Sequence, residues 1–164
     1  MKTYNQHAKW IALSGMLMAL GLSIGWFYIP ILGRNIYIVA IAIFLMPLIL
    51  PIGYTITTAA FTVALSDIIT GWAQWSWVSV IAYVAGVTII WFFAKSGRKI
   101  LFIVGMLIAS SVISFVYYIL FLIIEDNSVA IMSIFGNLIQ AGITIPISTI
   151  LYFPIKKISK SFEK

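Results

Sequence analysis

The sequence predicts an all-α integral membrane protein, in which six transmembrane helices form a single bundle and residues 1–164 form one membrane domain. Two observations support this prediction. The chain is 63% hydrophobic and 9% charged, with a mean hydropathy of +1.13. Its apolar residues also come in long runs instead of amphipathic stripes. Because a helix needs about 20 mainly apolar residues to cross a bilayer, a chain of 164 residues provides five or six crossings.

The apolar runs place the crossings in order along the chain. The least certain boundary lies near Pro47, Pro51 and Gly53, where the chain either turns or kinks. A turn gives six crossings with both termini on one side, and a kink in one long helix gives five. With a turn, the expected spans are residues 10–28, 36–50, 54–69, 76–94, 100–124 and 129–153.

The basic residues favour six crossings. In that arrangement nine lysines and arginines fall on one side of the membrane and only Arg34 falls on the other. Positive charge near span ends marks the cytoplasmic side, so we expect a multi-pass cell-membrane protein with cytoplasmic N- and C-termini. The net charge of +6 then reports topology and not a nucleic-acid partner. The nine residues are Lys2, Lys9, Lys95, Arg98, Lys99, Lys156, Lys157, Lys160 and Lys164.

Several chemical classes find no support in the sequence. The chain has no cysteine, and its one histidine, His7, precedes the first predicted span. It also lacks a phosphate-binding GxxxxGK[ST] loop, a catalytic triad and a metal-ligand cluster. We therefore expect no enzyme activity, no metal and no cofactor in this chain.

The sixth predicted span carries a polar stripe within the run SIFGNLIQAG and beyond it. At about 100° per residue its members share one face, which should point into the protein or a cavity. Hydrogen bonding between helices is the simplest role for such residues. Asn137 and Gln140 lie nearer the outer surface than Thr144 and Ser148 do, and we consider a ligand role for them alongside helix packing. The stripe consists of Ser133, Asn137, Gln140, Thr144 and Ser148.

Further candidates lie near the outer ends of the third, fourth and fifth spans. Ser79 and Tyr83 share a face of the fourth span, and Tyr117 lies in the outer half of the fifth. Asp67 precedes the run GWAQWSW, whose tryptophans Trp72 and Trp75 are the remaining candidates. Tryptophans at a span end usually form an interfacial belt, but indole faces beside hydrogen-bonding groups also suit a planar heteroaromatic ligand.

The first span has small residues at helical spacing. Ala12, Gly15 and Ala19 lie on one face, and Gly21 and Gly25 lie on another. Small residues at this spacing allow another helix to approach closely in a membrane. The sequence leaves open whether each face packs internally or docks a partner protein.

These features together resemble the substrate-binding S components of energy-coupling-factor vitamin transporters, in particular the riboflavin-type and hydroxymethylpyrimidine-type branch. The resemblance rests on the six short spans, the small-residue first helix, Asp67-Ile-Ile-Thr-Gly71-Trp72 with its Trp-rich turn, and Gly136-Asn137-Leu-Ile-Gln140 before a basic C-terminus. It implies capture of a small aromatic vitamin or precursor, such as hydroxymethylpyrimidine, a pyridoxine-like ring or riboflavin. It also implies inward delivery with a membrane coupling subunit and two cytoplasmic ATPases.

The same resemblance assigns roles to residues. The first loop, residues 30–35, would gate the pocket, which adds Asn35 to the site, and the face of Ala12, Gly15 and Ala19 would contact the coupling subunit. In many relatives a lysine follows the aromatic turn, whereas Tyr83 stands here, which argues against an anionic ligand. Two alternatives remain: a self-sufficient small carrier, for example a dimer formed through Gly21 and Gly25, and a membrane scaffold or regulatory subunit without a ligand.

Overall fold

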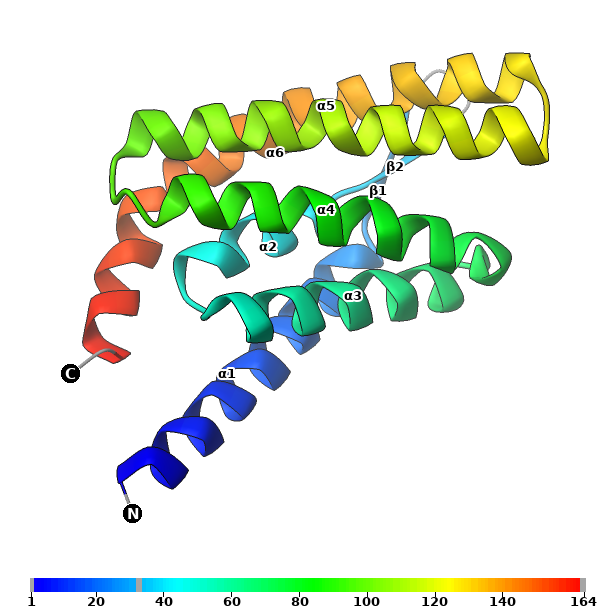
Figure 1. The fold of residues 1–164 in the computed structure, drawn as a ribbon. Coiled ribbons are helices and arrows are strands. Elements are labelled where there is room, and N and C mark those ends of the chain that lie inside the picture. Colours follow the sequence, from blue (N-terminus) through cyan, green and yellow to red (C-terminus); the bar gives the residue numbers. More distant parts are fainter. Residues whose placement is uncertain (1, 32–33, 163–164) are drawn as a thin grey trace.

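The computed structural model describes the backbone of residues 2–31 and 34–162 and the side chains of residues 6–28 and 36–159. Within these ranges the protein is mainly helical, with one short antiparallel hairpin (Figure 1). The elements in chain order are α1 (Lys2–Gly25), β1 (Tyr28–Ile31), β2 (Arg34–Tyr37), α2 (Val39–Leu45), the 3-10 helix η1 (Met46–Leu48), α3 (Ile52–Ile69), the 3-10 helix η2 (Ala73–Trp75), α4 (Ser76–Ala94), α5 (Lys99–Ile124) and α6 (Asn127–Phe162).

Five helices in the described part of the chain are long and apolar enough to cross a membrane. Their apolar spans are Gln6–Gly25, Ile52–Ile69, Ala73–Ala94, Lys99–Ile124 and Asn127–Ser159. The predicted spans 54–69, 76–94 and 100–124 agree with α3, α4 and α5 to within two residues. Helix α6 extends nine residues past the predicted end at residue 153 and reaches Phe162.

The prediction of one continuous helix over residues 36–50 is wrong. The segment contains the end of β2, the seven residues of α2 and the three residues of η1. At about 1.5 Å per residue, the helical part covers roughly half of a hydrocarbon core of about 30 Å. Two prolines shorten it: Pro47 lies in η1, and Pro51 precedes α3 in an extended conformation that no helix continues through.

The first predicted span is also too long at its outer end, and the fold is not purely α-helical. Helix α1 ends at Gly25, and Tyr28 already belongs to β1. Tyr28 pairs with Tyr37 and Ile29 with Ile36 in an antiparallel register. Aromatic and β-branched residues favour paired strands, and this hairpin takes the place of a helix-to-helix turn.

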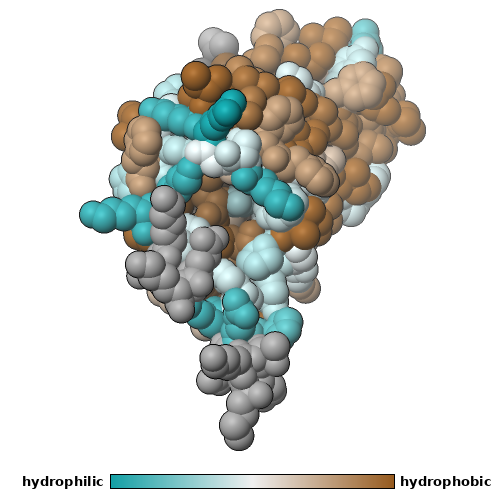
Figure 2. Space-filling view, turned by 60° about the vertical axis from the view of Figure 1, so that its left-hand side comes forward, coloured by the Kyte–Doolittle hydropathy of each residue, from teal (hydrophilic) through white to brown (hydrophobic). Residues whose placement is uncertain are grey.

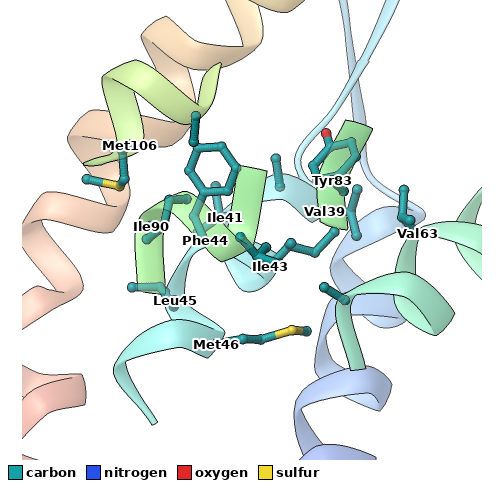
Figure 3. Packing of buried hydrophobic residues seen from close by; sticks show 14 of the residues in the cluster. Val39, Ile41, Ile43, Phe44, Leu45, Met46, Val63, Tyr83, Ile90 and Met106 are labelled. Atoms are coloured by element: carbon teal, nitrogen blue, oxygen red, sulfur yellow. The ribbon is translucent and has the colours of Figure 1, made fainter. Parts of the chain in front are cut away.

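Helix α2 forms the centre of the hydrophobic core instead of facing lipid. All seven of its residues are buried, and Ile43 is fully inaccessible. It contacts α1, α3, α4 and α6. Figure 3 shows Ile43 and Phe44 of α2 near Val63 of α3, Ile90 of α4 and Met106 of α5. The apolar run that predicted a second span therefore serves internal packing.

Both described chain ends lie at one end of the molecule (Figure 1). Helices α1 and α3 run parallel, since Gly21 lies beside Thr62 and Gly25 beside Ser66, so the chain returns between them through the hairpin, α2 and η1. Helices α3, α4, α5 and α6 then pack as successive antiparallel neighbours (Figure 1).

Basic residues gather at the end of the molecule that holds the described chain ends. Lys95 and Arg98 lie in or beside the α4–α5 loop, and Lys156 of α6 donates a hydrogen bond to the carbonyl oxygen of Gly97 in this loop. Figure 2 brings this end forward and shows hydrophilic side chains there, with hydrophobic surface along the flank. The acidic residues Glu125 and Asp126, between α5 and α6, lie at the opposite end. We call these the basic end and the acidic end.

Candidate functional site

Gln140 joins three elements near the acidic end of the molecule. Its side-chain nitrogen donates a hydrogen bond to the carbonyl oxygen of Tyr37 at the end of β2, with a nitrogen-to-oxygen distance of 2.8 Å. The same nitrogen donates to the hydroxyl of Tyr83 in α4 at 3.2 Å. A carboxamide nitrogen has two N–H donors, so both are used within the protein. Gln140 thus ties the hairpin to α4 and α6.

Asn137 lies one helical turn away from Gln140 and differs from it in its hydrogen bonding. Its side chain is half-buried and makes no hydrogen bond to any residue that the structure describes. A carboxamide offers two N–H donors and one carbonyl acceptor. Asn137 therefore presents unused hydrogen-bonding groups at a partly accessible position inside a membrane helix.

These groups face a cavity of about 140 Å³ between α5, α6 and the end of β2. Asn137 also lines a smaller space of about 10 Å³ deeper in the bundle, beside Tyr83 and Thr144. Ser133, on the wall of the larger cavity, donates its hydroxyl to its own helix, to the carbonyl oxygen of Ala130 at 2.7 Å. The larger cavity is lined by Ile36, Tyr37, Tyr117, Phe121, Ser133, Gly136, Asn137 and Gln140.

Aromatic rings form the α5 wall of this cavity. The ring of Phe121 stacks on that of Tyr117, with centroids 5.8 Å apart and planes 29° apart. Trp75, in η2, meets Phe121 edge to face at 5.0 Å. The predicted residues Tyr117 and Trp75 are thus joined through Phe121. A row of ring faces beside a carboxamide can bind a planar ring by stacking and orient it by hydrogen bonds.

A polar chain runs behind this wall from α5 to α3. The hydroxyl groups of Tyr117 and Ser79 form a hydrogen bond with an oxygen-to-oxygen distance of 2.6 Å, in which either hydroxyl can be the donor. The carboxyl group of Asp67 in α3 lies close to Ser79. The second carboxyl oxygen of Asp67 is buried and has no partner among the described residues.

Trp72 lies at the edge of the site and contacts it through Tyr37. Its indole N–H donates to the Tyr37 hydroxyl at 3.3 Å, and its side chain is about half exposed. Gly71 precedes it with a φ of +87°, a left-handed conformation that suits glycine in this turn. The side chain of the remaining predicted residue, Asn35, lies outside the described residues, as do the other side chains of the loop of residues 30–35 and the backbone of residues 32–33.

The rest of the polar stripe of α6 also points inward. Ser133, Thr144 and Ser148 are all buried. The hydroxyl groups of Thr144 and Ser148 find no hydrogen-bond partner among the described residues, so the expected bonds to neighbouring helices do not form there. No group of three or more metal-ligating side chains occurs in the part of the chain that the structure describes.

The two small-residue faces of α1 have different surroundings. Gly21 and Gly25 are buried, and a Cβ atom added to Gly21 would lie 2.7 Å from the Thr62 side chain. This face packs internally, which leaves it closed to a dimer contact. Ala12, Gly15 and Ala19 are exposed, and a Cβ atom on Gly15 would meet nothing within 4 Å.

The exposed side of α1 is hollowed. A groove of about 530 Å³ runs between α1 and α3 and includes Gly15, Gly53 and Phe61 in its walls. Its lining is almost entirely apolar. The groove lies in the half of the molecule toward the basic end. Tyr54, in its α3 wall, is hydrogen-bonded at 2.7 Å to His7 near the start of α1.

Two residues of the site do not follow from sequence reasoning, Tyr37 and Phe121. Tyr37 contributes its carbonyl oxygen and hydroxyl, but it lies in a segment that reads as membrane helix. Phe121 is four residues after Tyr117, so helical spacing alone places both rings on the same face of α5. This spacing is a signal from which Phe121 can be predicted.

No protein-family model matches this sequence, and no curated protein is significantly similar to it.

Proposed function

We propose that this protein is the substrate-capture subunit of a vitamin importer, of the energy-coupling-factor S component type. It binds a small aromatic vitamin or precursor at the acidic end and delivers it inward with a membrane coupling subunit and two ATPases. The resemblance of the sequence motifs supports this proposal, and so does the clustering of Asn137, Gln140 and Tyr117 around one cavity. Tyr83 and Ser79 adjoin this group through their hydrogen bonds to Gln140 and Tyr117.

In this proposal the chain crosses the cell membrane six times, with the basic end and both termini in the cytoplasm. The hairpin, α2 and η1 together make the second crossing, and the long helices shield α2 from lipid. The separation of Lys95, Arg98 and Lys156 from Glu125 and Asp126 supports this orientation by the positive-inside rule. The acidic end and the cavity beside it then face outward.

Asn137 is the observation that carries the binding role. A polar group inside a membrane protein is costly when unpaired, and nearly all other carboxamide and hydroxyl groups lining the cavity bond to the protein. Asn137 has no partner for its donors and acceptor among the described residues, and it lies at the cavity wall. A ligand that supplies complementary groups would satisfy them.

The size of the cavity favours a single ring as the ligand. Pockets for drug-sized molecules have volumes of about 300–1,000 Å³, and this cavity has about 140 Å³. A substituted pyrimidine or pyridine, such as hydroxymethylpyrimidine or pyridoxine, matches the smaller volume, whereas the three-ring riboflavin needs the site to open. No lysine or arginine lines the cavity among the described residues, which favours a neutral ligand.

The face of Ala12, Gly15 and Ala19 is the proposed contact with the coupling subunit. It is exposed and lies beside a groove that an apolar helix would fill. Close helix contacts in membranes use such small residues. A leucine at position 15 fits within this chain but prevents a partner helix from approaching closely. G15L should therefore preserve vitamin binding and abolish energy-dependent uptake. Loss of vitamin binding in G15L would instead show that this face stabilises the fold of the chain itself.

The experiment that tests the ligand role is a thermal-shift panel on purified protein in detergent. A ligand at a hundredfold excess over its Kd stabilises the folded state by about 2.7 kcal/mol. This corresponds to about 5–10 °C for a chain of this size. We expect a shift of this order with hydroxymethylpyrimidine or pyridoxine and none with pantothenate, which has no ring. Equal unfolding temperatures with every vitamin would reject the binding role and favour a scaffold without a ligand.

A further inference from the structure

A second polar cavity lies at the basic end, far from the vitamin site. It has a volume of about 320 Å³ and is formed by the start of α1, the η1–α3 connection, the end of α4 and the last turns of α6. Trp10 and Trp91 contribute indole rings to its walls, and Lys95 and Lys156 contribute ammonium groups. Tryptophan beside lysine is typical of the interface between lipid and water.

The two lysines make their contacts without a carboxylate partner among the described residues. The ammonium group of Lys156 donates to the carbonyl oxygen of Gly97 and to the hydroxyl of Tyr152, the latter at 2.9 Å. An ammonium group has three donors, so one remains for another acceptor. The ammonium group of Lys95 lies 5.2 Å from the ring centroid of Trp91. The described acidic residues, Asp67, Glu125 and Asp126, all lie at the opposite end.

Gly97 fixes the loop that positions this arrangement. Its φ is +70°, which disfavours any side chain, and an added Cβ atom would lie 3.2 Å from the ammonium nitrogen of Lys156. The Tyr152 hydroxyl also donates to the Gly97 carbonyl oxygen at 2.8 Å. The loop, Tyr152 and Lys156 therefore form a fixed cationic wall, and not a mobile surface lysine.

We propose that this cavity binds the phosphate group of an anionic phospholipid whose acyl chains lie along the apolar flank of α1 and α6. Basic pockets between helices on the cytoplasmic side of membrane proteins recognise such headgroups. The cavity supplies two cations for the phosphodiester and interfacial indoles for the glycerol region. It requires only that the protein resides in a membrane, so the proposal is independent of the vitamin-binding role.

Native mass spectrometry of the detergent-solubilised full chain tests the proposal. The protein is titrated with phosphatidylglycerol, with phosphatidylcholine carrying the same acyl chains, and with inorganic phosphate as a competitor. We expect retained phosphatidylglycerol adducts, weaker phosphatidylcholine adducts, and no displacement by phosphate. Equal retention of the two lipids would overturn the proposal, and displacement of phosphatidylglycerol by inorganic phosphate would show that a soluble phosphate is the true ligand.

Matched lysine and arginine variants assign binding to the cavity. K156Q and K95Q each remove a charge from its wall, and each should weaken phosphatidylglycerol binding about fivefold. K157Q removes the neighbouring exposed charge of α6, and R98Q removes one from the same loop; neither residue lines the cavity, so both should bind as the wild type does. Lys95 makes no hydrogen bond to a described residue, so K95Q should preserve the fold. It therefore tests the proposal even if K156Q fails to fold. Equal weakening in all four variants would contradict the assignment.

Discussion

Two carboxamides one turn apart on α6 are predicted to differ sharply in their contribution to stability. Gln140 makes two hydrogen bonds, to the Tyr37 carbonyl oxygen and the Tyr83 hydroxyl, and Asn137 makes none to the described residues. A hydrogen bond inside a membrane protein contributes about 0.6–2 kcal/mol. Replacing Gln140 by the similarly sized methionine, Q140M, should therefore cost about 1–4 kcal/mol in the free energy of unfolding.

The assay is thermal unfolding in detergent, followed by intrinsic fluorescence. A loss of 1 kcal/mol lowers Tm by about 2–4 °C in a chain of this size, so Q140M, at about 1–4 kcal/mol, should unfold roughly 2–16 °C below the wild type. N137L, which keeps the branched shape and the number of heavy atoms of the side chain, should unfold within about 2 °C of the wild type, since changes at partly accessible positions cost little. If N137L is destabilised as much as Q140M, Asn137 is a packing residue and the reasoning that assigns it to a ligand fails.

Three further predictions follow from contacts elsewhere in the molecule. G21L places a side chain against α3 and should lower stability by about 1–3 kcal/mol, whereas G15L should unfold at the wild-type temperature; equal losses would refute the division of α1 into a packed and an open face. S79A removes the hydroxyl of α4 that is hydrogen-bonded to Tyr117 of α5 and should cost about 1–3 kcal/mol, measured by the same unfolding assay; an unchanged Tm would show that this hydrogen bond carries no stability. For orientation, N127C should react with a membrane-impermeant maleimide in intact cells and S96C should not, and the reverse pattern would invert the proposed topology.

The long helices could be predicted because a membrane imposes simple rules on the sequence. A helix that crosses the hydrocarbon core must be apolar over about 20 residues, and this marks α3, α4 and α5 closely. The polar stripe of α6 could be placed inward for a related reason, since Ser133, Thr144 and Ser148 would be costly beside lipid. The inference from an apolar run to a membrane-crossing helix fails where the run is buried by protein. Helix α2 is such a run, because it is as apolar as a lipid-facing helix.

The site was predictable only where helical spacing decides which side chains share a face. That spacing brings Asn137 and Gln140 to one stripe and Ser79 and Tyr83 to another. It gives no indication that Gln140 bonds to a backbone carbonyl of a strand 103 residues earlier. A contact of this kind depends on where the chain folds back, which the residue types in the hairpin do not specify.

The proposed vitamin-binding function depends most directly on Asn137 as a ligand-binding residue. Isothermal titration of the purified protein with the vitamin that gives the largest thermal shift measures this, with N137A as the test and N127A, at the exposed start of α6, as the control. Loss of one or two ligand hydrogen bonds corresponds to about 1–3 kcal/mol, so N137A should raise Kd by about fivefold to a hundredfold while N127A binds as the wild type does. An unchanged Kd in a folded N137A protein would contradict the account.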